Sequence, residues 1–149
     1  MRAEWWKRLT PDQSQKLREL LAERYSDELH DVALVERAAE QLPYEHLRRV
    51  LRRIAARERQ HAEWLRAKIR ELGGTPPPPP ELPEAPTWQE VLEAFESEKA
   101  DQVEYLETAY GVRDPEVREL LERIQREEEE NYRDLLEVVT RMESHTGRA

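Results

Sequence analysis

Glu58 and His61 lie three residues apart in the segment Arg57-Glu58-Arg59-Gln60-His61, inside a run with strong helical character. Residues three apart on a helix project from one face about one turn apart. A carboxylate and an imidazole placed in this way can bind one metal ion. The pair alone is weak evidence for a metal site, because short spacings of this kind also occur in ordinary helices.

A second copy of this pattern follows seventy residues later in the chain. Glu58 corresponds to Glu128, and His61 corresponds to Asn131. The same offset relates further acidic and apolar residues: Glu28, Asp31, Leu21, Tyr25, Leu51 and Leu65 correspond to Glu98, Asp101, Val91, Phe95, Leu121 and Leu135. The chain therefore consists of two related helical hairpins.

The first hairpin has clear start and stop signals. Thr10 precedes a proline and a glutamine in capping-box positions, which predicts a helix over about 11–42. Pro43 interrupts the pattern, and a second helix is predicted over about 44–72, where two glycines end it.

The position of the turn predicts which residues meet. Pro43 lies midway between Glu28 and Glu58, so both glutamates lie roughly 22 Å from the turn at 1.5 Å per residue. Glu98 and Glu128 are likewise equidistant from the second turn. Each pair should meet at one level of its hairpin.

A segment with seven prolines, residues 73–86, joins the hairpins. In polyproline geometry it can reach roughly 43 Å, about the length of the preceding helix. We therefore expect a long crossover, followed by helices over about 88–110 and 115–142, in one domain spanning 1–149. The alternative, two independent hairpins on a tether, would leave each with a core too thin for stability.

Composition and charge exclude several classes of protein. The chain has 149 residues, a net charge of −9 and no cysteine, which argues against nucleic acid as the main partner and excludes a thiolate-bound iron–sulfur centre. No apolar run approaches the length of a membrane span, so we expect a cytoplasmic protein without a membrane partner. We expect the arginines of residues 48–57 to form a solvated face. Trp5-Trp6 is expected to fold back onto the bundle rather than dock on a membrane.

Four helices thus contribute carboxylates to the middle of a bundle, together with His61. Four ionised carboxylates in an apolar core repel one another and lose their hydration, so they call for cations, and two divalent metal ions would neutralise them. Each residue also has an ordinary interpretation: His61 as a core or surface histidine, and Glu127 to Glu130 as a solvated acidic face.

On these residues the sequence resembles the ferritin-like superfamily of di-metal carboxylate proteins, in particular the erythrin and rubrerythrin branch without a rubredoxin domain. The resemblance implies an all-α, ferritin-like antiparallel four-helix bundle. It further implies bridging roles for Glu58 and Glu128, terminal carboxylate roles for Glu28 and Glu98, and a terminal imidazole role for His61.

Asn131 departs from this pattern, which expects a second histidine there. An amide oxygen is a poorer ligand for iron than an imidazole nitrogen. Rubrerythrins have an additional carboxylate at the position that matches Asp101, and by pseudosymmetry Asp31 would then serve the metal near Asn131.

The implied function is a di-iron protein that reacts with dioxygen or hydrogen peroxide, as a ferroxidase or a peroxide reductase, using an external electron donor. The implied cofactors are two iron ions, with manganese as another possible metal and without haem. Tyr105 is a candidate to donate an electron or to hydrogen-bond a peroxide, with core packing as its alternative role. We expect a monomer or homodimer. The competing hypothesis is a metal-free or single-metal bundle with a structural or interaction role.

Overall fold

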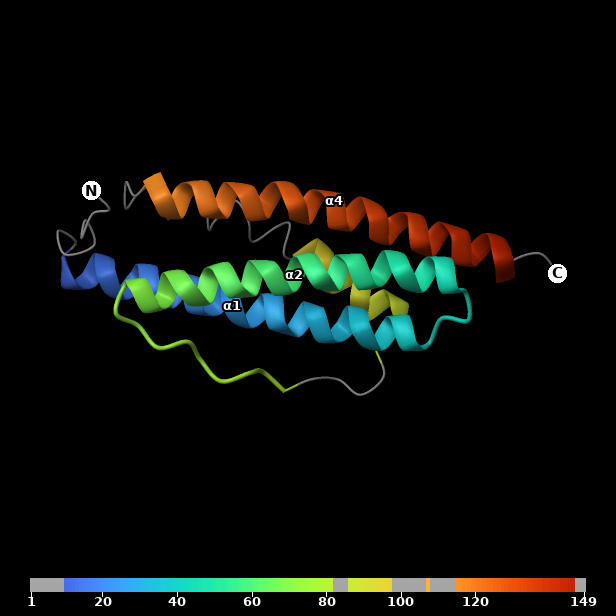
Figure 1. Cartoon of the computed structure of the whole chain (residues 1–149), viewed down its shortest axis with the longest axis horizontal. Coiled ribbons are helices and arrows are strands. Elements are labelled where there is room, and N and C mark those ends of the chain that lie inside the picture. Colours follow the sequence, from blue (N-terminus) through green and yellow to red (C-terminus); the bar gives the residue numbers. More distant parts are fainter. Residues whose placement is uncertain (1–9, 82–85, 98–106, 108–114, 147–149) are drawn as a thin grey trace.

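Long helices make up the computed structural model of this chain, which describes residues 10–81, 86–97, 107 and 115–146. The helices are α1 (Pro11–Glu40), α2 (Glu45–Glu71) and α4 (Pro115–Thr146), and residues 88–97 form a further helical segment (Figure 1). These ranges contain no strand. The expected all-α four-helix bundle is confirmed.

The start and stop signals act as the sequence predicts. The Thr10 hydroxyl accepts a hydrogen bond from the Gln13 backbone N–H at 3.2 Å, and the Gln13 side chain accepts one from the Thr10 N–H at 3.1 Å. Gly73 follows α2 with φ of 80°, a left-handed conformation that glycine adopts without steric cost. Helix α4 continues to Thr146, four residues beyond the expected end.

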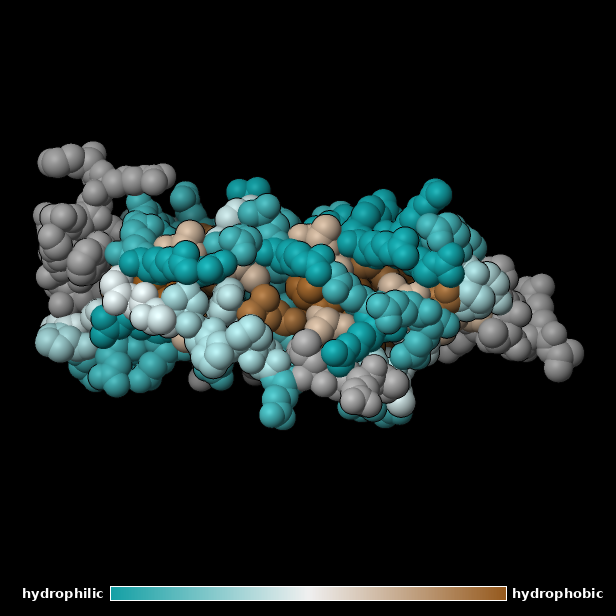
Figure 2. All heavy atoms as spheres, turned by 60° about the horizontal axis from the view of Figure 1, so that its bottom comes forward, coloured by the Kyte–Doolittle hydropathy of each residue, from teal (hydrophilic) through white to brown (hydrophobic). Residues whose placement is uncertain are grey.

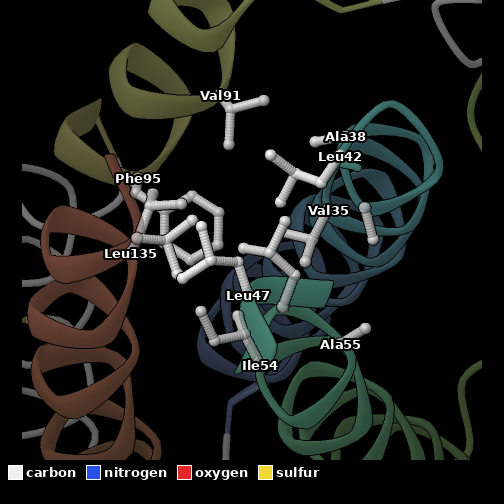
Figure 3. Close-up of a cluster of buried hydrophobic side chains, with 12 residues drawn as sticks. Val35, Ala38, Leu42, Leu47, Ile54, Ala55, Val91, Phe95 and Leu135 are labelled. Carbon is white, nitrogen blue, oxygen red and sulfur yellow. The ribbon is translucent and has the colours of Figure 1, made fainter. Parts of the chain in front are cut away.

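The proline-rich connection is a crossover. Residues 73–81 leave the end of α2 and run back along the outside of the α1–α2 hairpin (Figure 1). Val91 and Phe95 are buried at the opposite end of this hairpin, among side chains from the end of α1 and the start of α2. Leu135 of α4 packs in the same cluster (Figure 3). All four helical segments therefore share one core, which argues against two independent hairpins.

Two apolar clusters lie on either side of the middle of the bundle. One contains Leu21, Leu65 and Leu121, and the other contains Leu47, Phe95 and Leu135. Glu28, Glu58 and His61 come between these residues along α1 and α2. The fold thus holds polar side chains in a central layer that apolar residues close on both sides.

The face of the bundle seen in Figure 2 is mostly hydrophilic, with apolar atoms visible between rows of polar side chains. Of the arginines that the sequence predicts on a solvated face, Arg49 and Arg52 are exposed and pair with Glu45. Arg57 departs from this prediction, because it is only 25% exposed and pairs with Glu130 and Asp134 of α4. Among the residues with assigned positions, no helix is long and apolar enough to cross a membrane. Trp5-Trp6 lies outside the described residues.

Candidate metal centre

Glu28 of α1, Glu58 and His61 of α2, and Glu128 of α4 converge in the middle of the bundle. One potential ligand atom from each of the four lies within 4.8 Å of those of the others. Glu28, Glu58 and His61 are fully buried, and the Glu128 side chain is 11% exposed. The structure therefore brings together four of the residues that the sequence singled out.

The His61 ring is held through both of its nitrogens. Nδ1 lies 3.0 Å from Oε1 of Glu128 and 3.5 Å from Oε2 of Glu28. Nε2 lies 3.2 Å from Oε1 of Glu127, which the sequence analysis had considered only as part of an acidic face. In a metal-binding histidine, a carboxylate that hydrogen-bonds to the ring nitrogen that does not bind the metal, the outer nitrogen, fixes the orientation of the ring. Glu127 thus aims Nδ1 at the carboxylates of the centre.

Arg24 is a part of the centre that the sequence analysis missed. Its side chain is fully buried, and Nη2 lies 3.0 Å from Oε1 of Glu28 and 3.6 Å from Oε1 of Glu128. Arg24 stands four residues before Glu28, which places both on one face of α1. The spacing could have predicted this position, because a residue one turn before a core glutamate lies on the same buried face of the helix.

Asn131 occupies the place of the expected second histidine, but its amide makes other contacts. Its Nδ2 amino group donates a hydrogen bond of 2.7 Å to Oε1 of Glu58. Its Oδ1 accepts one of 2.8 Å from Nη1 of Arg57, which also binds Asp134 at 2.9 Å. The donor and the acceptor fix the orientation of the amide. The oxygen that would serve as a metal ligand therefore faces Arg57.

Asp31 is the other predicted carboxylate ligand that the structure describes. Asp31 is buried, and its Oδ2 has no hydrogen-bond partner among the residues with assigned positions, but it is not one of the four clustered residues. Glu98, Asp101 and Tyr105 lie outside the described residues. Their roles stay predictions.

The buried charges influence one another strongly. Burial alone would raise the pKa of Glu28, but the Arg24 guanidinium and hydrogen bonds with Glu58 and His61 lower it. Burial would lower the pKa of His61, but hydrogen bonds with Glu128 and Glu28 raise it to about 10. Burial and the negative charge of Glu28 raise the pKa of Glu128. At neutral pH, the metal-free centre therefore contains an imidazolium and a guanidinium among its carboxylates.

These shifts predict how the stability of the metal-free protein depends on pH. The lowered pKa of Glu28 gives stability that is present above 4.5, its ordinary value, and is lost as the pH falls. The raised pKa of His61 gives stability that is present below 6.5 and is lost as the pH rises through about 10. The raised pKa of Glu128 makes its ionisation costly, so stability also falls as the pH rises above 4.5.

We therefore expect the urea midpoint of the metal-free protein to be highest near pH 4.5 and to fall as the pH rises from there. Urea unfolding in the presence of a chelator, from pH 4 to pH 9, measures this. A midpoint that rose steadily toward pH 9 would contradict the charge arrangement.

The donor set fits a divalent metal ion. Three carboxylates and an imidazole are ligands that iron, manganese and zinc accept. Both carboxylate oxygens of Glu28 are buried beside positive groups of the centre: Nη2 of Arg24 lies 3.0 Å from Oε1, and Nδ1 of His61 lies 3.5 Å from Oε2. The three carboxylates around His61 suit a bound cation, because their negative charges would otherwise repel one another.

Three helices of this four-helix bundle contribute buried carboxylates and a histidine. This is the kind of ligand arrangement that carboxylate metal-binding bundles have. The sequence comparison gives the family: residues 33–144 match the ferritin-like domain, and the chain belongs to the ferritin-like domain family.

Two solved structures show the same fold. The bacterioferritin of Desulfovibrio desulfuricans, described with its diiron site in different catalytic states, is 20% identical, with a TM-score of 0.80 over 89% of this chain and 83% of its own. A bacterioferritin of Mycobacterium tuberculosis is 23% identical, with a TM-score of 0.71 over 91% of this chain and 89% of its own. No curated protein sequence matches the chain.

Proposed function

We propose that this protein binds iron at the centre formed by Glu28, Glu58, His61 and Glu128, and that it is a ferroxidase or peroxide reductase. The observation that carries the proposal is the convergence of these four side chains within 4.8 Å in the buried middle of the bundle. The diiron site named for the Desulfovibrio desulfuricans bacterioferritin supports iron as the metal. The rubrerythrin branch stays a prediction within this proposal.

Several residues of the chain would bind the iron or support the residues that bind it. His61 would offer Nδ1, which already lies against oxygens of Glu28 and Glu128. Glu58 of α2 and Glu128 of α4, whose carboxylates lie within 4.8 Å of the other ligand atoms, would hold the metal as well, and Glu98 is the candidate for a further carboxylate. Bound iron supplies a Lewis acid and a redox centre for dioxygen or hydrogen peroxide. Glu127 holds the outer nitrogen of His61, and the apolar clusters above and below exclude water.

A second candidate function is a bundle that holds one metal ion or none and has a structural or interaction role. Two observations favour it. The Asn131 oxygen faces Arg57 rather than the centre, which removes a ligand from one of two metal positions. Arg24 already supplies a positive charge to Glu28 and Glu128.

Metal stoichiometry tests the proposal and separates the candidates. We expect anaerobic titration with ferrous iron, followed by removal of loose metal and elemental analysis, to give two irons per chain. Mixing with hydrogen peroxide or dioxygen should then oxidise the bound iron, which absorbance in the near ultraviolet follows. One retained iron would support the single-metal bundle. Retention of none would refute metal binding and leave the structural role.

A further inference from the structure

Arg24 is the buried charged residue whose role the proposed function does not explain. Among the residues that the structure describes, it is the only arginine or lysine that is buried. An arginine stays protonated at all physiological pH values, so this side chain carries a permanent positive charge into the middle of the bundle. Burying this charge is unfavourable unless negative groups offset it, because a charge loses its hydration on burial.

The guanidinium lies against the oxygens that a metal ion would bind. Nη2 is 3.0 Å from Oε1 of Glu28 and 3.6 Å from Oε1 of Glu128. The same Glu128 oxygen lies 3.0 Å from Nδ1 of His61, the nitrogen that faces the carboxylates. Arg24 thus shares its acceptor oxygens with the candidate metal position.

We propose that Arg24 is a built-in counter-ion that stabilises the metal-free centre and weakens the binding of divalent cations. The inference rests on the proposed metal site. The guanidinium offsets part of the negative charge of Glu28, Glu58 and Glu128, which would otherwise repel one another in a buried space. A metal ion at this site is attracted less strongly by the carboxylates, because the permanent positive charge of Arg24 lies beside two of them, Glu28 and Glu128. Arg24 therefore lowers the affinity of the centre for a divalent metal ion.

Charge and packing can be separated by substitution at this one position. Arg24→Met removes the charge and keeps a long side chain that adapts to the cavity. Arg24→Gln removes the charge and keeps a hydrogen-bonding group, and it serves if the methionine variant does not fold. Arg24→Lys keeps the charge. Arg66→Met, at a side chain of α2 that is 41% exposed, is the control for loss of an arginine outside the centre.

The measurements are calorimetric titration with Mn²⁺ and urea unfolding of the metal-free proteins. We expect the neutral variants to bind Mn²⁺ at least about tenfold more tightly than the wild type and to unfold at lower urea when metal-free. Arg24→Lys and Arg66→Met should both bind Mn²⁺ within about threefold of the wild type.

Equal or weaker Mn²⁺ binding by the neutral variants would overturn the inference while leaving the metal site in place. Tighter binding by Arg24→Lys to the same extent as by Arg24→Met would overturn it too, because the effect would then not depend on charge. A complete lack of Mn²⁺ binding by the wild type and all variants would refute the metal site of the proposed function, and this inference with it.

Discussion

Glu58→Ala should remove metal binding, with the apparent affinity for divalent iron or manganese falling at least about a hundredfold. Glu58 is fully buried. It belongs to the group of four ligands, and its Oε1 also accepts the hydrogen bond from Asn131. Its loss takes one of the three carboxylates from this group.

Thermal unfolding measures the same loss through stability. A ligand present at a hundred times its dissociation constant stabilises the folded state by about 2.7 kcal/mol, which raises the melting temperature of a chain of this size by roughly 5–10 °C. We expect manganese to produce such a shift in the wild type and none in Glu58→Ala.

The matched control is Glu63→Ala, on the same helix, where the side chain is 66% exposed and pairs with Arg66. It should keep both the metal affinity and the thermal shift. A Glu58→Ala variant that bound manganese as tightly as the control would place the metal elsewhere.

Phe95→Ala should destabilise the whole bundle by about 3–5 kcal/mol, which lowers the melting temperature by roughly 6–20 °C. Phe95 is 2% exposed and packs with residues of α1, α2 and α4 (Figure 3). Alanine leaves a cavity that the surrounding helices cannot close without losing contacts elsewhere.

This variant also tests the crossover. If residues 88–97 pack against the first hairpin, the loss of Phe95 destabilises α1 and α2 as well, and the helical signal should melt in one transition at the lower temperature. Leu136→Ala, at a side chain that is 40% exposed, is the control and should change stability by no more than about 0.5 kcal/mol. Independent melting of two halves in Phe95→Ala would contradict the shared core.

The pairing of α1 with α2 was predictable because it depends on distances along the chain. Pro43 interrupts the helical pattern, and Glu28 and Glu58 lie equally far from it, so an antiparallel hairpin brings them to one level whatever the side chains around them do. The length of residues 73–86 allowed a return along the bundle, but the burial of Val91 and Phe95 against Leu47 was needed to show it.

The seventy-residue repeat predicted the position of Asn131 but not the groups that it binds. It placed Asn131 where His61 stands in the first hairpin, and the structure buries both beside Glu58. Their hydrogen bonds differ, however, because Arg57 lies next to Asn131, whereas Glu127 lies next to the outer nitrogen of His61. Arg57 and Glu127 come from different helices than the residues they bind.

The sequence by itself determined α1 and α2, the turn at Pro43 and the level at which Glu28 and Glu58 meet, since all of these follow from spacing along one chain. Only the tertiary structure decided that Arg24 lies among the carboxylates, that Glu127 orients His61 and that the Asn131 oxygen faces Arg57. Buried charged side chains form ion pairs and hydrogen bonds with residues of other helices. The energies of these interactions depend on distances of a few ångströms, and the spacing of residues along the chain does not define those distances.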